Sequence, residues 1–308
     1  MKRSFPISVH QKLCATVVAL ALGLTGACAS TRTAAGTAAG TTASTTEDEV
    51  VRMTWARSDV PVRIDGMSFP VVAGLTSWAA FSPAAGGAML MGDVVVFQDE
   101  VSPAMDAAFA HGIEITALHN HFFHDEPRVY FMHIGGHGDA AQLARGVEAI
   151  WDAIRGVRSK LPEPASSFPG EAPVPGRIDA AMIARITGQE TALKDGGVVK
   201  ITIGREAVMH GARFGGSMGL TTWAAFTGSD ELAAIDGDLA MTASEVQPVL
   251  RALRRAGIHV VALHNHMIGE EPAYFFTHFW GKGLAADLAR GFRSALDAQR
   301  EARRGGAH

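Results

Sequence analysis

The sequence predicts an α+β fold made of two tandem homologous halves, each approximately β-β-β-α-β-β-α with its helices packed on a mainly antiparallel sheet. Two observations predict this fold. The chain repeats itself at an offset of 145 residues, as from Trp78 to Trp223, and short β-branched segments alternate in each half with segments of helical periodicity. A composition of 47 % hydrophobic and 19 % charged residues is that of a globular protein with a buried core.

The repeat is a direct duplication. Leu75–Phe81 (LTSWAAF) and Leu220–Phe226 (LTTWAAF) agree at six of seven positions. Gly112–His121 (GIEITALHNH) and Gly257–His266 (GIHVVALHNH) agree at seven of ten. A period this long indicates two domain-sized halves rather than an array of small repeats.

Each element of the first half follows from periodicity and local signals. Ser102 and Pro103 are typical of a helix N-cap and first turn, and Asp139 is typical of a second N-cap. The predicted elements are strands at Val62–Phe69, Thr76–Phe81 and Ala88–Gln98, a helix at Pro103–His111, strands at Ile113–His121 and Arg128–Ile134, and a helix after Asp139. The second half repeats this order, with a further short helix expected over Ile178–Ile186.

The N-terminus predicts export. Lys2 and Arg3 make a basic start, and Leu13–Leu24 is an apolar core of 12 residues, which has the length of a signal-peptide core and is too short to span a bilayer. The small residues of LTGACAS resemble a lipobox, in which Cys28 carries the lipid. Ordinary cleavage after Ala29 is the alternative.

Composition divides the rest of the chain. Ala, Thr, Gly and Ser dominate the segment after the cysteine, and five prolines stand between the halves. We therefore expect a lipoprotein-type signal peptide over residues 1–27, a flexible Ala/Thr-rich tether over 28–47, the first repeat over 48–157, a Pro-rich linker with a short helix over 158–196, the second repeat over 197–300 and a disordered tail over 301–308.

Charge and hydropathy restrict the partners. A net charge of −4 gives no electrostatic reason to expect nucleic acid. No segment after the N-terminal core runs for 18 apolar residues, so we expect no transmembrane helix in the body of the chain. The expected location is that of a membrane-anchored lipoprotein facing the periplasm or the cell exterior, with the membrane reached through the N-terminal lipid.

Imidazoles and carboxylates gather at equivalent places in the two halves. They are His119, His121, Glu126 and His133 in the first half, and His264, His266, Glu271 and His278 in the second. Imidazole and carboxylate are ligands of zinc and similar divalent metals, which take three or four donors. The sequence therefore indicates a divalent metal such as zinc as the candidate cofactor, and the same groups are also able to form a structural network of polar residues at strand ends.

The register of one hairpin decides whether a third histidine joins the pair. Residues two apart on a strand point to the same side, so His119 and His121 are able to converge on one ion. If the hairpin loop is symmetric, His119 faces Tyr130 and His133 lies on the opposite face of the sheet. A slip of one residue, with His121 opposite Val129, places His133 on the face of His119.

Other polar and aromatic residues recur in both halves. Trp78 and Trp223 are interpreted either as core aromatics or as flat platforms for a sugar ring. Asp93 and Asp238 each follow a glycine and are predicted to be turn residues. Glu100 precedes a predicted helix, where a carboxylate favours the positive end of the helix dipole.

Two long segments carry a family resemblance. ALHNHFFHDEPRVYFMHIGGHGDAAQLARG and ALHNHMIGEEPAYFFTHFWGKGLAADLARG resemble the LppY/LpqO family, bacterial proteins of about this length that contain a domain of unknown function and include mycobacterial lipoproteins. The resemblance covers both halves, from about Arg57 to Arg300, and includes SWAAF and the DEV and SEV helix starts. It implies export and lipidation, and it implies no activity or ligand set.

Two functional hypotheses follow. The first is an exported lipoprotein that serves as a ligand-binding or interaction module at the cell envelope, with a protein or a small molecule as its partner. The second is a metal-dependent enzyme, such as a hydrolase, in which one His-His-Glu set holds the ion and His133 or His278 acts as acid or base.

Overall fold

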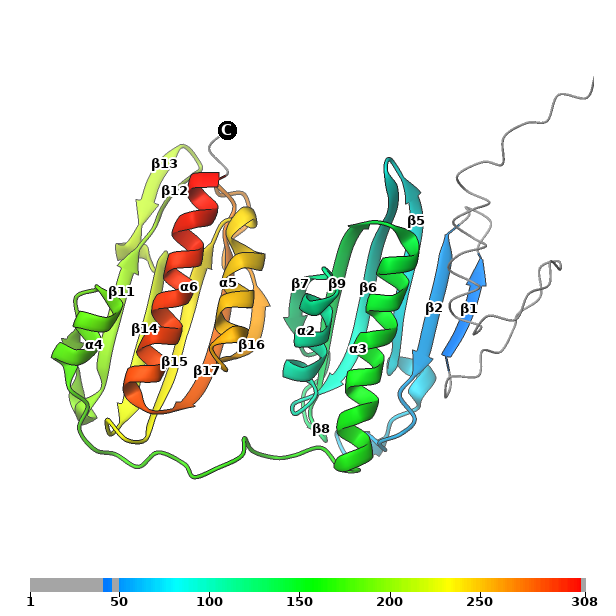
Figure 1. Ribbon diagram of the computed structural model, residues 1–308, viewed down its shortest axis with the longest axis horizontal. Coiled ribbons are helices and arrows are strands. Elements are labelled where there is room, and N and C mark those ends of the chain that lie inside the picture. The colour runs from blue at the N-terminus through cyan, green and yellow to red at the C-terminus, as the bar shows by residue number, and fades with distance from the viewer. Residues whose placement is uncertain (1–40, 46–49, 306–308) are drawn as a thin grey trace, which may run out of the picture. The chain divides into compact units, whose positions relative to one another are not determined.

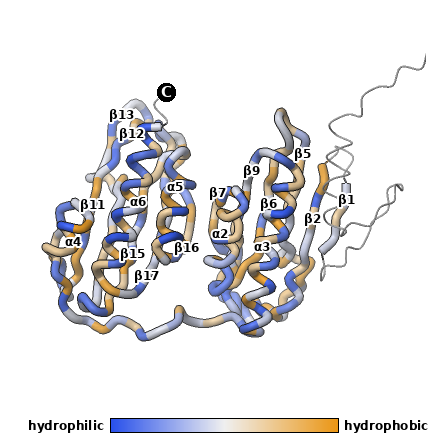
Figure 2. Tube along the Cα trace, viewed as in Figure 1, coloured by the Kyte–Doolittle hydropathy of each residue, from blue (hydrophilic) through white to orange (hydrophobic). Residues whose placement is uncertain are grey.

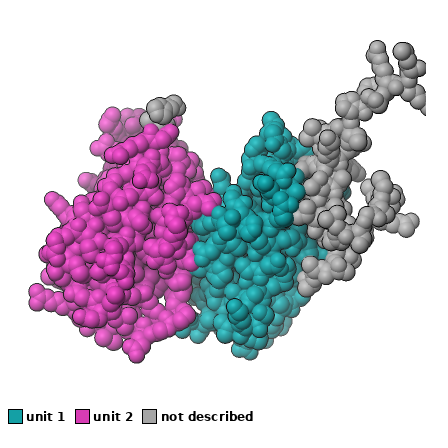
Figure 3. All heavy atoms as spheres, viewed as in Figure 1, with its two compact units in different colours: residues 1–167 teal, residues 168–308 magenta. Residues whose placement is uncertain are grey.

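The computed structural model describes residues 41–45 and 50–305 of the chain. The chain divides into two compact units, with the division between Ser167 and Phe168 (Figure 3). Each unit is a mixed α/β structure built on a large antiparallel sheet (Figure 1), which confirms the predicted α+β class and two-repeat organisation at this level. The predicted signal peptide and Cys28 lie outside the described residues.

Unit 1 contains one main sheet and a small one. The main sheet has the strand order β1-β2-β5-β6-β9-β7, and the small sheet has the order β4-β3-β8. The elements are β1 (Thr41–Thr45), β2 (Val51–Ala56), β3 (Arg63–Ile64), β4 (Met67–Ser68), β5 (Thr76–Ala84), β6 (Gly87–Phe97), α2 (Val101–Ala110), β7 (Glu114–His119), β8 (Asp125–Glu126), β9 (Val129–Gly138) and α3 (Ala140–Lys160), with a 3-10 turn at Val71–Ala73.

Unit 2 repeats this arrangement with additions at its start. Its main sheet has the order β16-β17-β15-β14-β11-β10, and β12 and β13 form a separate hairpin. The elements are α4 (Ala180–Thr187), β10 (Ala192–Leu193), β11 (Val199–Gly204), β12 (Glu206–Met209), β13 (Ala212–Gly215), β14 (Thr221–Gly228), β15 (Ala233–Met241), α5 (Ala243–Arg255), β16 (His259–His264), β17 (Phe275–Gly283) and α6 (Ala285–Gly305), with 3-10 turns at Asp195–Gly197 and Gly216–Met218.

Several segments differ from the sequence expectation. Thr41–Thr45, placed in the flexible tether, forms strand β1 along the edge of β2, where β-branched threonines suit a strand. Helix α2 begins at Val101 rather than at Pro103, because the Ala104 amide already donates a helical hydrogen bond to the Glu100 carbonyl at 2.9 Å. The predicted tail from residue 301 is helical up to Gly305, since Arg303 bonds the buried Glu245.

In each unit the helices lie over one face of the sheet (Figure 1). Helices α3 and α6 alternate between hydrophobic and hydrophilic residues along the chain (Figure 2), and their apolar residues are buried. Gly136 in β9 faces α3, because a Cβ built on it would stand 3.0 Å from the Leu143 side chain. Leu90 pairs with Gly136, so it faces the helices, while Asp93 and Val95 face the other side, which we call the helix-free face.

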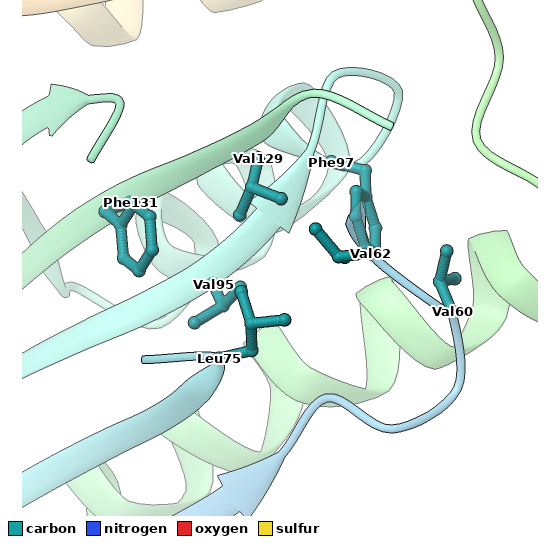
Figure 4. Close-up of a cluster of buried hydrophobic side chains, with 7 residues drawn as sticks. All are labelled: Val60, Val62, Leu75, Val95, Phe97, Val129 and Phe131. Atoms are coloured by element: carbon teal, nitrogen blue, oxygen red, sulfur yellow. The ribbon is translucent and has the colours of Figure 1, made fainter. Parts of the chain in front are cut away.

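A second core covers part of the helix-free face. In unit 1 it joins side chains from β6 and β9 to the segment between β2 and β5, and they point toward one another (Figure 4). Its members are Val60, Val62, Leu75, Val95, Phe97, Val129 and Phe131. The equivalent cluster of unit 2 consists of Ala207, Leu220, Ala240, Tyr274 and Phe276. Apolar side chains therefore cover one end of the helix-free face, and polar side chains lie on the rest of it.

A buried carboxylate joins four elements of unit 1. Glu100 is fully buried and accepts two bonds of 2.9 Å from the Arg57 guanidinium, which follows β2. It also accepts from the Phe97 amide at 2.9 Å and pairs with Arg158 of α3 at 2.8 Å. Burial raises the pKa of Glu100, and the two guanidiniums oppose that shift. Glu100 thereby connects the start of α2, the end of α3 and two strands.

Unit 2 contains the same centre with different partners. Glu245 accepts from both terminal nitrogens of Arg205 at 3.1 Å and from the Thr242 amide at 3.0 Å. Gln299 and Arg303 of α6 supply the remaining bonds, each at 2.9 Å. The glutamate directly before α2 and the glutamate in the first turn of α5 therefore each serve as the acceptor of a buried ion-pair centre.

None of the helices within residues 41–45 and 50–305 is both long enough and apolar enough to cross a bilayer.

Glu100→Gln tests the buried centre. Removing the charge takes away the anion that the two buried guanidiniums share, although Arg57 keeps Asp59 and Arg158 keeps Asp99, so the free energy of unfolding should fall by about 3 kcal/mol. Urea unfolding of the full chain, followed by circular dichroism, measures this. The control is Glu148→Gln, which removes a partly exposed pair with Arg155 at 3.5 Å and should cost less than about 1 kcal/mol. Equal losses for the two variants would contradict the assignment.

Candidate functional site

The register of the β7–β9 hairpin brings three histidines to the helix-free face of unit 1. His119 pairs with Phe131, which is the slipped register, so His133 lies on the face of His119. The Nε2 atoms of His119 and His133 are 3.0 Å apart, and their rings stack with centroids 5.0 Å apart. The His121 ring stacks on Phe131 and lies 5.1 Å from that of His119.

Unit 2 repeats this arrangement. His264 pairs with Phe276, and the His266 ring stacks on Phe276 with centroids 3.5 Å apart. The Nε2 atoms of His264 and His266 are 3.2 Å apart, and the His264 and His278 rings stack at 5.0 Å. The three histidines of each unit are thus brought together, as the sequence allowed in one of its two registers.

A buried aspartate completes each group, which corrects the prediction of turn residues. Asp93 lies in the middle of β6, directly opposite His133, and Asp238 lies in β15 opposite His278. Asp93 is 8 % exposed and Asp238 is 2 % exposed, and the Oδ1 atom of each is buried without a hydrogen-bond partner. Oδ2 of Asp238 stands 3.5 Å from Nε2 of His266. We call these two groups of three histidines and one aspartate the histidine clusters.

The glycine before each aspartate is required by close packing. A Cβ built on Gly92 would stand 2.7 Å from the Trp78 carbonyl oxygen, and one built on Gly237 would stand 2.3 Å from that of Trp223. The Gly-Asp pair is therefore a feature of a crowded strand and not of a turn. Gly237 also accepts a bond at its carbonyl from Nδ1 of His278, at 3.2 Å.

The two tryptophans lie on the same face, next to the aspartates. Trp78 pairs with Asp93 and Trp223 pairs with Asp238, and each indole is half-buried. Arg52 stands over the Trp78 ring at 4.5 Å, and Lys200 over the Trp223 ring at 4.6 Å. One face of each indole is thus occupied by a cation, so a sugar would stack on that face only if the cation moved.

The predicted glutamate ligands lie in another environment. Glu126 belongs to β8 and pairs with Arg63 of β3, while Glu271 bridges to Val208. Within the described residues, neither glutamate carboxylate has a hydrogen bond or ion pair with the histidines. Asp93 and Asp238, and not these glutamates, are the carboxylates that accompany the imidazoles.

The carboxylate before each of those glutamates holds the loop. Asp125 is buried and accepts from the Val129 amide at 2.6 Å, and Glu270 accepts from the Tyr274 amide at 2.8 Å. The peptide bonds from Glu126 and Glu271 to the following prolines are cis in both units. These two buried acids are structural, because each carboxylate accepts a hydrogen bond from a backbone amide of its own hairpin.

No three His, Cys, Asp or Glu side chains in the described part of the chain stand in a metal-holding arrangement. The close approaches are pairwise: two imidazole nitrogens in each unit, and one imidazole with one carboxylate in unit 2. In each imidazole pair, one ring nitrogen donates and the other accepts. The predicted metal role of the histidines stays a prediction at this point.

Burial sets the charge state of the imidazoles. It lowers the pKa of His121, His264 and His266, so that their neutral forms dominate at pH 7. Asp93 opposes the shift at His121, and Asp238 opposes it at His264 and His266. Burial raises the pKa of Asp238, while the neighbouring histidines lower it. The clusters therefore present neutral nitrogen acceptors beside a carboxylate that is poorly solvated.

Proton titration of the histidines followed by NMR checks this description. In the full chain treated with a chelator, His121, His264 and His266 should titrate below the usual value of about 6.5. Asp238→Asn removes the charge that favours the imidazolium, so the midpoint of His266 should fall further. At these three imidazoles the native chain binds fewer protons than the unfolded chain below pH 6.5, so their contribution to the free energy of unfolding should fall as the pH drops from 7 to 5. A rise of the His266 midpoint in Asp238→Asn would contradict the arrangement.

Comparisons with known proteins give a family and weak structural likenesses. The model of the DUF1529 family, described as Domain of Unknown Function (DUF1259), matches residues 33–153 and 181–298. No curated protein matches the chain.

Among solved structures, three similar chains have TM-scores of 0.20 to 0.21. The trimeric bacterial microcompartment shell protein PduB is 11 % identical, with 85 % of this chain and 92 % of that chain covered, at a TM-score of 0.20. EutL from Clostridium perfringens is 13 % identical, with 71 % and 83 % covered, at 0.20. EtuB from Clostridium kluyveri is 10 % identical, with 85 % and 91 % covered, at 0.21. Likenesses this weak support no conclusion about fold or function.

The family match corrects the resemblance to the LppY/LpqO family, because the model that matches both repeats is that of DUF1529. The expectations of an internal repeat and of a domain of unknown function are confirmed by the same match. Since the two matched segments together cover more than half of the chain, it belongs to the DUF1529 family, described as Domain of Unknown Function (DUF1259).

Proposed function

We propose that each unit is a ligand-binding module and that its site is the histidine cluster on the helix-free face of the sheet. The observation that supports this most directly is a buried aspartate, with an unpartnered oxygen, beside three imidazoles in both units. These residues stand where no helix covers the sheet, next to a half-buried tryptophan. The proposed ligand therefore binds to the part of this face that the apolar cluster leaves uncovered.

The competing explanation is that the histidine clusters are structural networks, in which each buried polar atom would have a hydrogen-bond partner. The buried Glu100 carboxylate meets this condition, since both of its oxygens have partners at hydrogen-bond distance. Asp93 and Asp238 each bury one oxygen without a partner, and Nδ1 of His264 is buried in the same way. Leaving a buried polar group unpaired costs about 1–3 kcal/mol, so these groups lower the stability of the free protein. Sites kept at a cost in stability are typical of binding.

The chemistry of the cluster indicates the kind of ligand. A carboxylate oxygen and neutral imidazole nitrogens accept hydrogen bonds or donate electron pairs. A matching ligand carries positive charge or several hydrogen-bond donors. An apolar ligand would leave these groups unpaired, and an anion would meet the carboxylate.

We further propose that this module is held at the cell envelope by a lipid on Cys28. The basic N-terminus, the 12-residue apolar core and the small residues before that cysteine support this proposal. An Ala/Thr-rich stretch then separates the cysteine from the first strands of the folded unit. The binding sites would face the periplasm or the cell exterior.

Asp93→Asn separates binding from structural support. The amide has the shape of the carboxylate without its buried charge, so the free energy of unfolding of the chelator-treated full chain should rise by about 1 kcal/mol. Asp238→Asn should act in the same direction in unit 2. Urea unfolding at pH 7 measures both changes.

Asp125→Asn and Glu270→Gln are the matched controls, since these buried carboxylates accept a backbone amide at 2.6 and 2.8 Å. Both should lower the stability. If Asp93→Asn and Asp238→Asn lowered it to the same degree, the clusters would be structural networks and the proposal of a binding site would fall.

Incorporation of labelled palmitate tests the lipid anchor in cells that express the full chain. The wild type should take up label, and Cys28→Ser should abolish the incorporation. Cys14→Ser should leave it unchanged, because Cys14 lies inside the predicted signal-peptide core. Unchanged labelling of Cys28→Ser would show that the lipobox assignment is wrong.

A further inference from the structure

We propose that the ligand of each histidine cluster is a divalent metal ion of the zinc class, held by three imidazoles and one aspartate. This inference rests on the proposed binding function and names its ligand. The donors are His119, His121, His133 and Asp93 in unit 1, and His264, His266, His278 and Asp238 in unit 2.

The spacing of the donor atoms fits such an ion. Ligands placed 2.0–2.1 Å from a tetrahedral zinc stand about 3.3 Å from one another. The Nε2 atoms of His119 and His133 are 3.0 Å apart, and those of His264 and His266 are 3.2 Å apart. The carboxylate of Asp238 adds a third atom at 3.5 Å from His266. Taken pair by pair, these separations are close to that of two neighbouring ligands of one ion.

Hydrogen bonds from Nδ1 to the backbone leave Nε2 of two cluster histidines available to bind a metal. Nδ1 of His119 lies 3.3 Å from the carbonyl oxygen of Asn120, and Nδ1 of His278 lies 3.2 Å from that of Gly237. A carbonyl oxygen accepts, so each Nδ1 carries the proton and leaves Nε2 with its lone pair. Histidines that bind metal through Nε2 commonly donate Nδ1–H to a carbonyl in this way.

The aspartates supply the charge that a cation requires. Asp93 and Asp238 are at least nine-tenths buried, each is the direct cross-strand neighbour of a cluster histidine, and each has an unpartnered oxygen. Three neutral imidazoles and one carboxylate give a set of net charge −1 for a divalent ion. Imidazole in this proportion favours zinc, copper or nickel over magnesium and calcium, which prefer oxygen ligands.

Closing the site requires movement of His121 and His266. In the described structure no three donors share one centre, and the rings of His121 and His266 stack on Phe131 and Phe276. Both histidines lie two residues beyond His119 and His264, the last paired residues of β7 and β16, while the paired strands hold the other donors. Binding would therefore turn these two rings from the aromatic side chains toward the ion.

Metal titration of the full chain tests the proposal. The chain carries Cys14→Ser and Cys28→Ser, so that thiols contribute no ligands, and is first treated with a chelator and dialysed. Zinc is added with calorimetric detection, and cobalt is then used as a spectroscopic probe of coordination. We expect two zinc ions per chain and the intense visible absorption of tetrahedral cobalt.

Single-unit variants assign the ligands. Asp93→Asn, and separately His133→Gln, should weaken one of the two sites at least about tenfold and leave the other unchanged. Asp238→Asn should do the same for the second site. Glu126→Gln and Glu271→Gln are the matched controls, since their carboxylates stand apart from the imidazoles, and both should retain two zinc ions. Circular dichroism of every variant verifies that it is folded.

The outcomes separate this inference from the function on which it rests. Less than a tenth of an equivalent of zinc and cobalt bound to the folded chain, or binding that Glu126→Gln abolishes and Asp93→Asn preserves, would overturn the metal assignment. If Asp93→Asn nevertheless stabilises the chelator-treated chain, the binding site stands and its ligand is a different cation or hydrogen-bond donor. If that variant destabilises the chain and no metal binds, both proposals fall.

Discussion

One extra residue in a strand determines where the histidines point. In β7 the pairing with β9 shifts by one residue between Ile115 and Ala117, and in β16 the same shift falls between Val260 and Ala262. Ile115 and Leu118 are three residues apart and both fully buried, although a regular strand would turn them to opposite faces. The bulge allows both to face the helices, and it thereby directs His119 to the other side.

The buried ion-pair centres give this hairpin a fixed support. Glu100 and Glu245 each join the start of one helix, the end of another and two strands. Such a centre contributes little net stability compared with apolar packing, but it penalises every arrangement that leaves its charges unpaired. It therefore selects one position of the helices on the sheet, and the helices in turn select which residues of β7 and β16 are buried.

The sequence predicts the class of the fold and most of its elements, because apolar periodicity and the duplication are local signals that single residues carry. It also predicts which histidines gather. It does not predict that Asp93 and Asp238 join the histidines, since Gly-Asp is typical of turns. The signal that could have identified these aspartates is their position in the middle of a segment predicted to be a buried strand. Glu126 is close to the histidines in sequence but lies in β8, paired with Arg63 of β3, because closeness in sequence does not fix which way a loop directs a side chain.

The division of the helix-free face explains why a buried carboxylate can exist next to solvent. Val95 and Phe131, two residues from Asp93 and His133 along their strands, belong to the apolar cluster that the segment between β2 and β5 closes. That cluster removes water from one side of Asp93, while the imidazoles stand on the other. A carboxylate desolvated in this way interacts more strongly with a bound cation than an exposed one does. The packing that completes the core of each unit is thus the same packing that would give its site affinity.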